Sequence, residues 1–246
     1  MKRATVLIVI LLAVLLVVAC GKDAPIGDGQ TASTATAVAP STATTTTPAI
    51  PPRSAHDGCK AVAAPGPSPN PTRRRSRKRL SVKHGYIAVL QTNCGTIRIL
   101  LSVRRAPKTT SSFAGLVRNG FYDGLTFHRI AKPGGNDYVI QGGDPRGDGN
   151  GGPGYSVVEK PSKRTRYVRG VVAMAKTATD PPGTSGSQFF IVTAKEAPLP
   201  PQYAILGRVI GSDKVVRRIA RLATDPVSEM PVDPVVMEHV RIVRRR

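Results

Sequence analysis

The sequence predicts one mainly β domain over residues 85–246, built as a closed barrel with two helices at its ends. All six Tyr and all five Phe lie at or beyond Tyr86, so only this part of the chain can bury a sizeable core. Within it, short apolar runs recur at close spacing, which favours strands over long helices. A closed barrel is expected because it leaves no strand edge exposed.

The elements are expected in a definite order. Residues 86–93 and 96–101 alternate around the turn at Cys94-Gly95 and predict a hairpin. Pro107 suits the first turn of a helix over 107–119, and Gly120 suits its end. Further strands are predicted over 126–130, 137–141, 171–175, 188–193 and 204–210, followed by a helix over 213–222 and a last strand over 235–243.

The N-terminus has the pattern of a targeting signal. Lys2 and Arg3 precede an apolar run that ends in Ala19-Cys20-Gly21, which is typical of a lipoprotein signal peptide cleaved before a lipidated cysteine. The alternative is an uncleaved helix, but the run from residue 4 to residue 19 is shorter than the ~20 residues needed to span a bilayer. We therefore expect a signal peptide over 1–19, a lipid on Cys20 and an extracytoplasmic domain anchored to a bacterial cell membrane.

Residues 20–84 predict a disordered linker. They are rich in Ala, Thr, Pro and Ser and contain no aromatic residue, so they cannot bury enough apolar surface to offset the entropy lost on ordering. The chain carries a net charge of +21, and the densest basic run comprises Arg73, Arg74, Arg75, Arg77, Lys78 and Arg79. Such a run can be a solvated, self-repelling segment or can contact anionic lipid or cell-wall polymer. Specific nucleic-acid binding is not expected, because the protein is exported and no aromatic residue is interleaved for base stacking.

Two cysteines remain once Cys20 carries a lipid. Cys59 lies in the linker and Cys94 in the hairpin turn. An extracytoplasmic location permits a disulfide between them, and closing that loop of about 35 residues would contribute on the order of 3 to 4 kcal/mol. Two free thiols are the alternative.

Three motifs resemble those of cyclophilins, the family of peptidyl-prolyl cis-trans isomerases. They are Phe127-His128-Arg129-Ile130, the run from Tyr138 to Asp144, and the run from Gly183 to Ile191. The resemblance extends in order from about residue 86 to residue 243. The block from Gly151 to Tyr155, the Cys94 turn and the signal pattern are similar to an exported bacterial branch of the family. The implied fold is an eight-stranded antiparallel barrel with two capping helices.

The resemblance also implies a site that needs no cofactor and no metal. Arg129 matches the catalytic arginine, and Gln141 would hold it in place. Gln188 and the backbone of Lys176 would bind the main chain of the substrate. The proline pocket would be lined by Tyr138, Val139, Phe190, Leu199 and Tyr203. Because rotation about an amide bond transfers no proton, His128 is expected to be a packed structural residue and Asp144 a loop anchor.

Two departures from the family pattern adjoin this site. The connection over residues 131–137 is longer than usual. Pro198 stands where many cyclophilins have tryptophan, which predicts weak inhibition by the macrocycle cyclosporin.

Three functions remain to be compared: a monomeric isomerase acting on exported proteins, a non-catalytic module that binds proline-containing segments as a chaperone at the cell envelope, and an envelope-attachment protein that depends on its basic linker. The presence of Arg129, Gln141 and Phe190 together favours catalysis, since a binding groove needs the pocket but not the guanidinium.

Overall fold

The computed structural model describes residues 58–66 and 73–245. The predicted signal peptide, Cys20 and the first part of the predicted linker therefore lie outside the described residues. Neither helix in the described ranges is long and apolar enough to cross a membrane.

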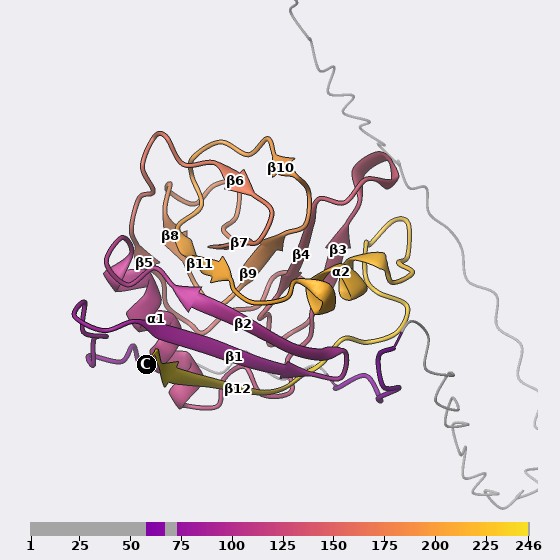
Figure 1. The fold of residues 1–246 in the computed structure, drawn as a ribbon, viewed down its shortest axis with the longest axis horizontal. Coiled ribbons are helices and arrows are strands. Elements are labelled where there is room, and N and C mark those ends of the chain that lie inside the picture. Colours follow the sequence, from indigo (N-terminus) through magenta and orange to yellow (C-terminus); the bar gives the residue numbers. More distant parts are fainter. Residues whose placement is uncertain (1–57, 67–72, 246) are drawn as a thin grey trace, which may run out of the picture. The chain divides into compact units, whose positions relative to one another are not determined.

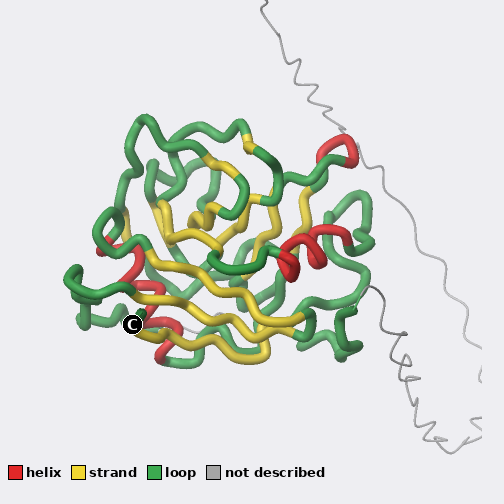
Figure 2. The backbone as a smooth tube through the Cα atoms, viewed as in Figure 1, coloured by secondary structure: helices red, strands yellow, loops and turns green. Residues whose placement is uncertain are grey.

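Eight antiparallel strands form one sheet, and Figure 2 shows how this sheet curls. In spatial order they are β12 (Met237–Arg244), β1 (Tyr86–Thr92), β2 (Gly95–Leu101), β11 (Ile205–Val209), β7 (Val171–Met174), β9 (Phe189–Val192), β4 (Val139–Gly142) and β3 (Arg129–Ala131). Two short ladders stand apart from this sheet. One pairs β6 (Tyr167–Val168) with β10 (Glu196–Ala197), and the other pairs β5 (Val157–Val158) with β8 (Thr184–Ser185). These two-residue pairs are too short to leave an alternating pattern, so the sequence did not predict them.

The sheet is not a closed barrel, and that prediction was wrong. The edge strands β12 and β3 do not pair. One isolated antiparallel bridge and a few backbone hydrogen bonds span the gap instead: Phe127 N donates to Val235 O at 2.9 Å, Met237 N of β12 to Leu125 O at 2.8 Å, and Ile130 N to Glu229 O at 2.8 Å. The segment that faces β3 carries prolines at positions 226, 231 and 234, which have no N–H to donate to a ladder. The barrel therefore stays open at this point.

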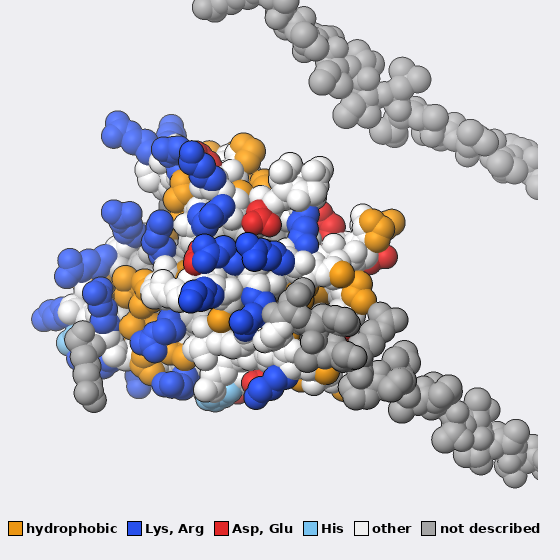
Figure 3. All heavy atoms as spheres, turned by 45° about the vertical axis from the view of Figure 1, so that its right-hand side comes forward, with side chains coloured by type: hydrophobic (Ala, Val, Ile, Leu, Met, Phe, Trp, Pro, Cys, Tyr) orange, Lys and Arg blue, Asp and Glu red, His pale blue; other side chains and the backbone are white. Residues whose placement is uncertain are grey.

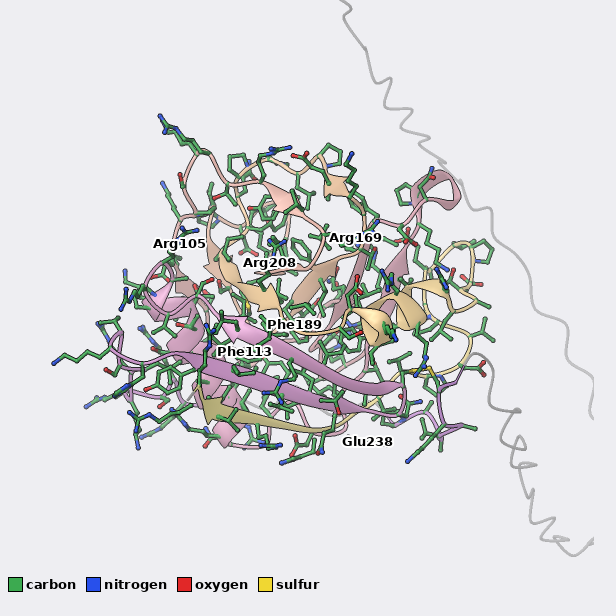
Figure 4. All side chains as sticks on the ribbon, viewed as in Figure 1. Arg105, Phe113, Arg169, Phe189, Arg208 and Glu238 are labelled. Atoms are coloured by element: carbon green, nitrogen blue, oxygen red, sulfur yellow. A yellow bond between two sulfur atoms is a disulfide. The ribbon has the colours of Figure 1, made fainter. Side chains whose placement is uncertain are left out.

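Two helices lie at opposite ends of the curled sheet (Figure 1): α1 (Pro107–Arg118) and α2 (Lys214–Arg221). Both were predicted from sequence. The Glu159 carboxylate accepts hydrogen bonds from Lys108 N at 3.2 Å and Thr109 N at 2.9 Å, which satisfies free donors at the start of α1. Figure 4 shows Phe113 of α1 and Phe189 of β9 inside the domain, where their ring centroids lie 6.1 Å apart with perpendicular planes.

The packed structure begins before residue 85, where the sequence placed the domain boundary. Leu80 is only 4% exposed, and its backbone N donates to Ser111 Oγ at 3.0 Å. A Cβ added to Gly115 of α1 would come within 2.7 Å of the Ser76 Cβ, so the chain crosses α1 at close range. The end of the predicted linker therefore lies along α1, because Leu80 supplies an apolar anchor within a polar run.

Cys59 and Cys94 form a disulfide across a sequence separation of 35. The Arg218 guanidinium of α2 donates to Gly58 O at 3.1 Å and to Cys94 O at 2.8 Å. Together these contacts fix the first described residues onto the β1–β2 turn beside α2.

Candidate active site

Arg129 and Gln141 are direct neighbours across the β3–β4 ladder, and Gln141 is paired in turn with Phe190 of β9. Side chains of directly paired residues lie on the same face of a sheet. The Arg129 Nη1 lies 3.4 Å from Gln141 Oε1, a long hydrogen bond, and the Gln141 amide donates to Gln188 Oε1 at 2.9 Å. Hydrogen bonds therefore connect Arg129 and Gln141, the two residues expected to act in catalysis, with Gln188.

Glu229 holds the same guanidinium and was not foreseen from the sequence. Its Oε2 lies 2.6 Å from Arg129 Nε, and the two side chains are 31% and 40% exposed. The turn that carries it is closed on itself, because Asp225 Oδ1 accepts hydrogen bonds from the backbone N of Val227 and Ser228. No local pattern marks Glu229, since the ion pair joins residues that lie 100 positions apart.

The conformation of Glu229 is unusual. Its φ of 57° is the only positive φ of a non-glycine residue in the described ranges, a region that costs free energy for a residue with a Cβ. Its carbonyl is fixed by Ile130 N of β3 at 2.8 Å. This hydrogen bond holds the Glu229 backbone beside Ile130, the residue that follows Arg129. From there the Glu229 carboxylate reaches the Arg129 guanidinium.

The five residues expected to line a proline pocket come together in a second apolar cluster, separate from the main core. Val139 and Phe190 are each 4% exposed, and Tyr138, Leu199 and Tyr203 pack against the cluster while staying partly exposed. The rings of Phe190 and Tyr203 lie 5.4 Å apart at 85°. We call this partly exposed apolar cluster the slot; it includes Phe190, whose register neighbour Gln141 contacts Arg129.

Tyr167 packs against two slot residues, Phe190 and Tyr203, and was also not predicted from the sequence. It is fully buried, and its ring lies 6.2 Å from that of Phe190. Its hydroxyl donates to Tyr203 O at 2.8 Å and accepts from Tyr203 N at 2.9 Å. Burial raises the pKa of the Tyr167 phenol. Tyr167 therefore fixes the backbone of Tyr203 at the slot.

A cavity of about 430 Å³ adjoins the slot and is lined by Gln141, Lys176, Gln188 and the loop over residues 149–156. The Gln188 amide nitrogen donates to Gly149 O at 2.8 Å and to Gly151 O at 2.9 Å. A substrate carbonyl that accepts from the Gln188 amide nitrogen has to displace one of these bonds, whereas a substrate N–H can donate to Gln188 Oε1. The Lys176 ammonium lies 5.8 Å from the Tyr203 ring centroid, within cation–π range, and so links the cavity to the slot.

Comparison with known proteins identifies the family. The family model described as cyclophilin type peptidyl-prolyl cis-trans isomerase/CLD matches residues 87–242. The chain belongs to the cyclophilin family. Peptidyl-prolyl cis-trans isomerase A of Mycobacterium tuberculosis is 39% identical over 173 residues, which cover 63% of this chain and 91% of that protein. Peptidyl-prolyl cis-trans isomerase B of Streptomyces anulatus is 36% identical over 176 residues, covering 64% and 97%.

A solved cyclophilin supports the fold. The crystal structure of a Cryptosporidium parvum cyclophilin type isomerase, determined in the presence of the dipeptide Ala-Pro, superposes with a TM-score of 0.58 at 29% identity. The match covers 64% of this chain and 98% of that one.

His128 of this cyclophilin is a structural residue and is not arranged as a base. It is 5% exposed, and neither ring nitrogen has a hydrogen-bond partner among the described residues. Burial lowers its pKa, with Asp144 opposing that shift, so the ring is neutral at pH 7. Asp144 accepts hydrogen bonds from Arg146 N at 2.9 Å and Gly149 N at 2.6 Å, which anchors the loop over residues 146–149.

The two departures from the family pattern lie at the surface. The longer connection folds into a 3-10 turn over Pro133–Gly135, in which Gly134 and Gly135 both have positive φ. Pro198 is exposed beside Leu199 of the slot. The cyclophilin thus has no indole at this edge of the pocket.

Proposed function

We propose that this cyclophilin rotates Xaa-Pro bonds in exported proteins, with Arg129 as the catalytic residue. The observation that carries the proposal is a guanidinium held by two partners beside an apolar slot. The slot takes the proline ring, the cavity beside Gln188 takes the flanking main chain, and Arg129 faces the bond that rotates.

The chemistry follows from the electronic structure of the amide. The rotation barrier of roughly 18 to 20 kcal/mol arises because the nitrogen lone pair is delocalised into the carbonyl. In the twisted transition state the lone pair is localised on nitrogen, where it can accept a hydrogen bond from a guanidinium. This bond is stronger in the transition state than in either planar ground state, so it lowers the barrier. Arginine suits this role because it remains charged and presents a rigid fork of donors.

The contacts of Arg129 leave some N–H donors of its guanidinium for the substrate. Glu229 occupies the Nε donor and Gln141 one of the two Nη1 donors, which leaves the other Nη1 donor and both Nη2 donors for the prolyl nitrogen. The slot supplies binding energy for the proline ring in both isomers, as an isomerase requires.

The decisive experiment compares residues 20–246, with Cys20→Ser, and the same chain with Arg129→Ala. Exchange between the cis and trans forms of an Ala-Pro peptide is measured by NMR. We expect at least a tenfold loss of kcat/KM, equivalent to about 1.4 kcal/mol. Arg105→Ala, an exposed arginine before α1 (Figure 4), is the matched control and should keep full activity. Equal rates for Arg129→Ala and the parent chain would remove Arg129 from the mechanism.

The same experiment tests the non-catalytic alternative. A chain that binds the Ala-Pro peptide without accelerating its exchange would be a proline-binding module. The position of Arg129 beside the slot favours the enzyme, because binding alone needs no guanidinium there.

The proposed location is outside the cytoplasm, with the chain tethered through a lipid on Cys20 after removal of residues 1–19. The signal pattern ending in Ala19-Cys20-Gly21 supports this, as does the Cys59–Cys94 disulfide, which suits an oxidising compartment. Cys20→Ala should move the protein from the membrane to the soluble fraction. Unchanged membrane retention of that variant would reject the anchor.

A further inference from the structure

A second charged site lies at the α2 end of the domain, and its lining includes none of the residues proposed for catalysis or proline binding. A cavity of about 650 Å³ is lined by six charged side chains, of which Asp137 is the only acid. The five bases, which we call the α2 basic face, are Arg169, Lys214, Arg217, Arg218 and Arg221. Figure 3 brings this side of the molecule forward and shows Lys and Arg side chains gathered on it.

The α2 basic face is hardly neutralised by the protein itself. Among the described residues, its one ion pair joins Arg217 to Asp213 at 3.1 Å. Arg169, labelled in Figure 4, donates from Nε to Thr193 O at 2.9 Å. Arg218 is held by the carbonyls of Gly58 and Cys94. Carbonyls orient a guanidinium without cancelling its charge, so the cavity keeps a positive potential that attracts anions.

Helix α2 does not need these charges for its own packing. Its buried residues are Val216, Ile219 and Ala220, whereas Lys214, Arg217 and Arg221 are exposed. The three exposed bases recur at helical spacing and so share the outer side of the helix. Like charges at such spacing destabilise a helix. The position of Arg221 in the last turn favours the helix dipole and Arg217 pairs with Asp213, so the stability of α2 accounts for only part of this charge.

The chain that leads to Cys20 joins the domain at this same face. Gly58, the first described residue, accepts the hydrogen bond from Arg218, and Cys59 is fixed to Cys94 by the disulfide. Cys20 lies 38 positions before Gly58. A lipid on Cys20 would therefore keep the α2 end of the domain within reach of the bilayer.

We propose that the α2 basic face docks on anionic lipid headgroups, with headgroup phosphates entering the cavity. This inference rests on the proposed lipid anchor, which raises the local concentration of the face near the membrane. Two features favour this occupant: the excess positive charge, and the point where the tether joins the domain. Docking would orient the domain by its α2 end instead of leaving it to rotate on its linker.

The basic run over residues 73–79 is the competing surface. Arg75, Arg77 and Arg79 line a separate cavity with Lys108 of α1. Because α1 and α2 lie at opposite ends of the sheet (Figure 1), the two basic surfaces are separate candidates for docking. The tether joins at the α2 end, so we assign the docking to that end.

The test uses residues 20–246 with Cys20→Ser, a chain that keeps every described residue and carries no lipid. Cosedimentation is measured with vesicles of phosphatidylcholine containing about one third phosphatidylglycerol, and with vesicles of phosphatidylcholine alone, in about 0.1 M salt. The triple variant Lys214→Gln, Arg217→Gln, Arg221→Gln removes charge from the α2 basic face. The matched control is Arg75→Gln, Arg77→Gln, Arg79→Gln.

The parent chain should bind only the anionic vesicles. Each removed charge should weaken binding about fivefold, so the α2 triple variant should bind roughly a hundredfold more weakly, while the control triple variant changes little. Both variants should keep full activity on the Ala-Pro peptide, which shows that they fold.

Three results would overturn the proposal: no binding of the parent to anionic vesicles, equal binding by the α2 variant and the parent, or a loss confined to the variant of residues 75–79. Because this chain has no lipid, none of these results bears on the anchor itself, which the Cys20→Ala fractionation tests separately.

Discussion

Removing the carboxylate of Glu229 should slow the isomerase without unfolding it. Glu229 is one of two side chains that hold the Arg129 guanidinium, and it is the nearer one: 2.6 Å from Nε, against 3.4 Å between Nη1 and Gln141 Oε1. In Glu229→Ala only the longer contact remains, so the arginine side chain can occupy several rotamers. The fraction of molecules with a donor aimed at the prolyl nitrogen falls accordingly.

The expected magnitude follows from the exposure of the pair. The side chains of Arg129 and Glu229 are 40% and 31% exposed, so solvent screens the ion pair and its contribution to stability is about 0.2 to 1 kcal/mol. Holding a long side chain in one rotamer involves an entropy of up to about 1.5 to 2 kcal/mol, and Gln141 retains part of that restraint. We therefore expect kcat/KM to fall about five- to tenfold, which corresponds to about 1 to 1.4 kcal/mol.

The assay is cis–trans exchange of the Ala-Pro peptide, with urea unfolding measured in parallel. Glu229→Gln keeps a neutral acceptor at the same place and should lose about two- to threefold, between the parent and the alanine variant, because a hydrogen bond to a charged acceptor is about twice as strong as one to a neutral acceptor. Asp225→Ala, which removes the acceptor that closes the turn, should resemble Glu229→Ala in rate. A purely structural role would lower the stability and leave kcat/KM unchanged.

One outcome would refute the reasoning outright. The carboxylate also draws positive charge away from the slot, so a faster Glu229→Ala enzyme would show that Glu229 restrains Arg129 as a brake instead of positioning it. The sign of the change in kcat/KM decides between the two.

Three further predictions concern stability and inhibition. Burial lowers the pKa of His128 from its ordinary value of 6.5. Below about pH 6.5 the His128 ring is therefore protonated in the unfolded chain before it is protonated in the folded chain. The free energy of unfolding should therefore decrease between about pH 7 and about pH 5, by up to about 1.4 kcal/mol per unit of pKa depression. His128→Gln should flatten the pH dependence of urea unfolding, and an unchanged slope would contradict this assignment. The double variant Cys59→Ser, Cys94→Ser should lose on the order of 3 to 4 kcal/mol in the same measurement, and a loss below about 1 kcal/mol would show that the disulfide constrains little of the unfolded chain. Cyclosporin should inhibit the enzyme only above micromolar concentrations, whereas Pro198→Trp should bind it at least tenfold more tightly; submicromolar inhibition of the parent chain would disprove this.

Much of the fold could be predicted from local patterns. The hairpin over β1 and β2 and both helices were predicted to within two residues, because alternation, the Pro107 start and the Gly120 stop are local signals. The short pairs β5–β8 and β6–β10 were not predicted, since two residues carry no period. Barrel closure was predicted wrongly because it depends on two strands at opposite edges, and no local pattern reports whether distant edges meet.

The residues of the site also divide into those that local patterns predict and those that they do not. Motif residues such as Arg129, Gln141 and Phe190 could be named because they stand in contiguous runs, and the sheet register brings them together. Glu229 and Tyr167 could not be named. Each acts through a contact made by the fold, with Arg129 in one case and with the backbone of Tyr203 in the other. Sequence spacing holds no information about such contacts.

The open edge of the sheet and the placement of Arg129 have one common cause. The segment over residues 225–236 runs beside β3, but its prolines prevent a regular ladder, so it contributes a turn where a closed barrel would have a strand. A ladder would alternate its side chains above and below the sheet and would occupy the backbone N–H groups in pairing. The turn instead holds Glu229 at a φ of 57°, with its carbonyl on Ile130 N and its carboxylate on Arg129. Arg129 therefore lies on an edge strand of three residues, exposed enough to reach a substrate and fixed by the turn that stands in place of a closing strand.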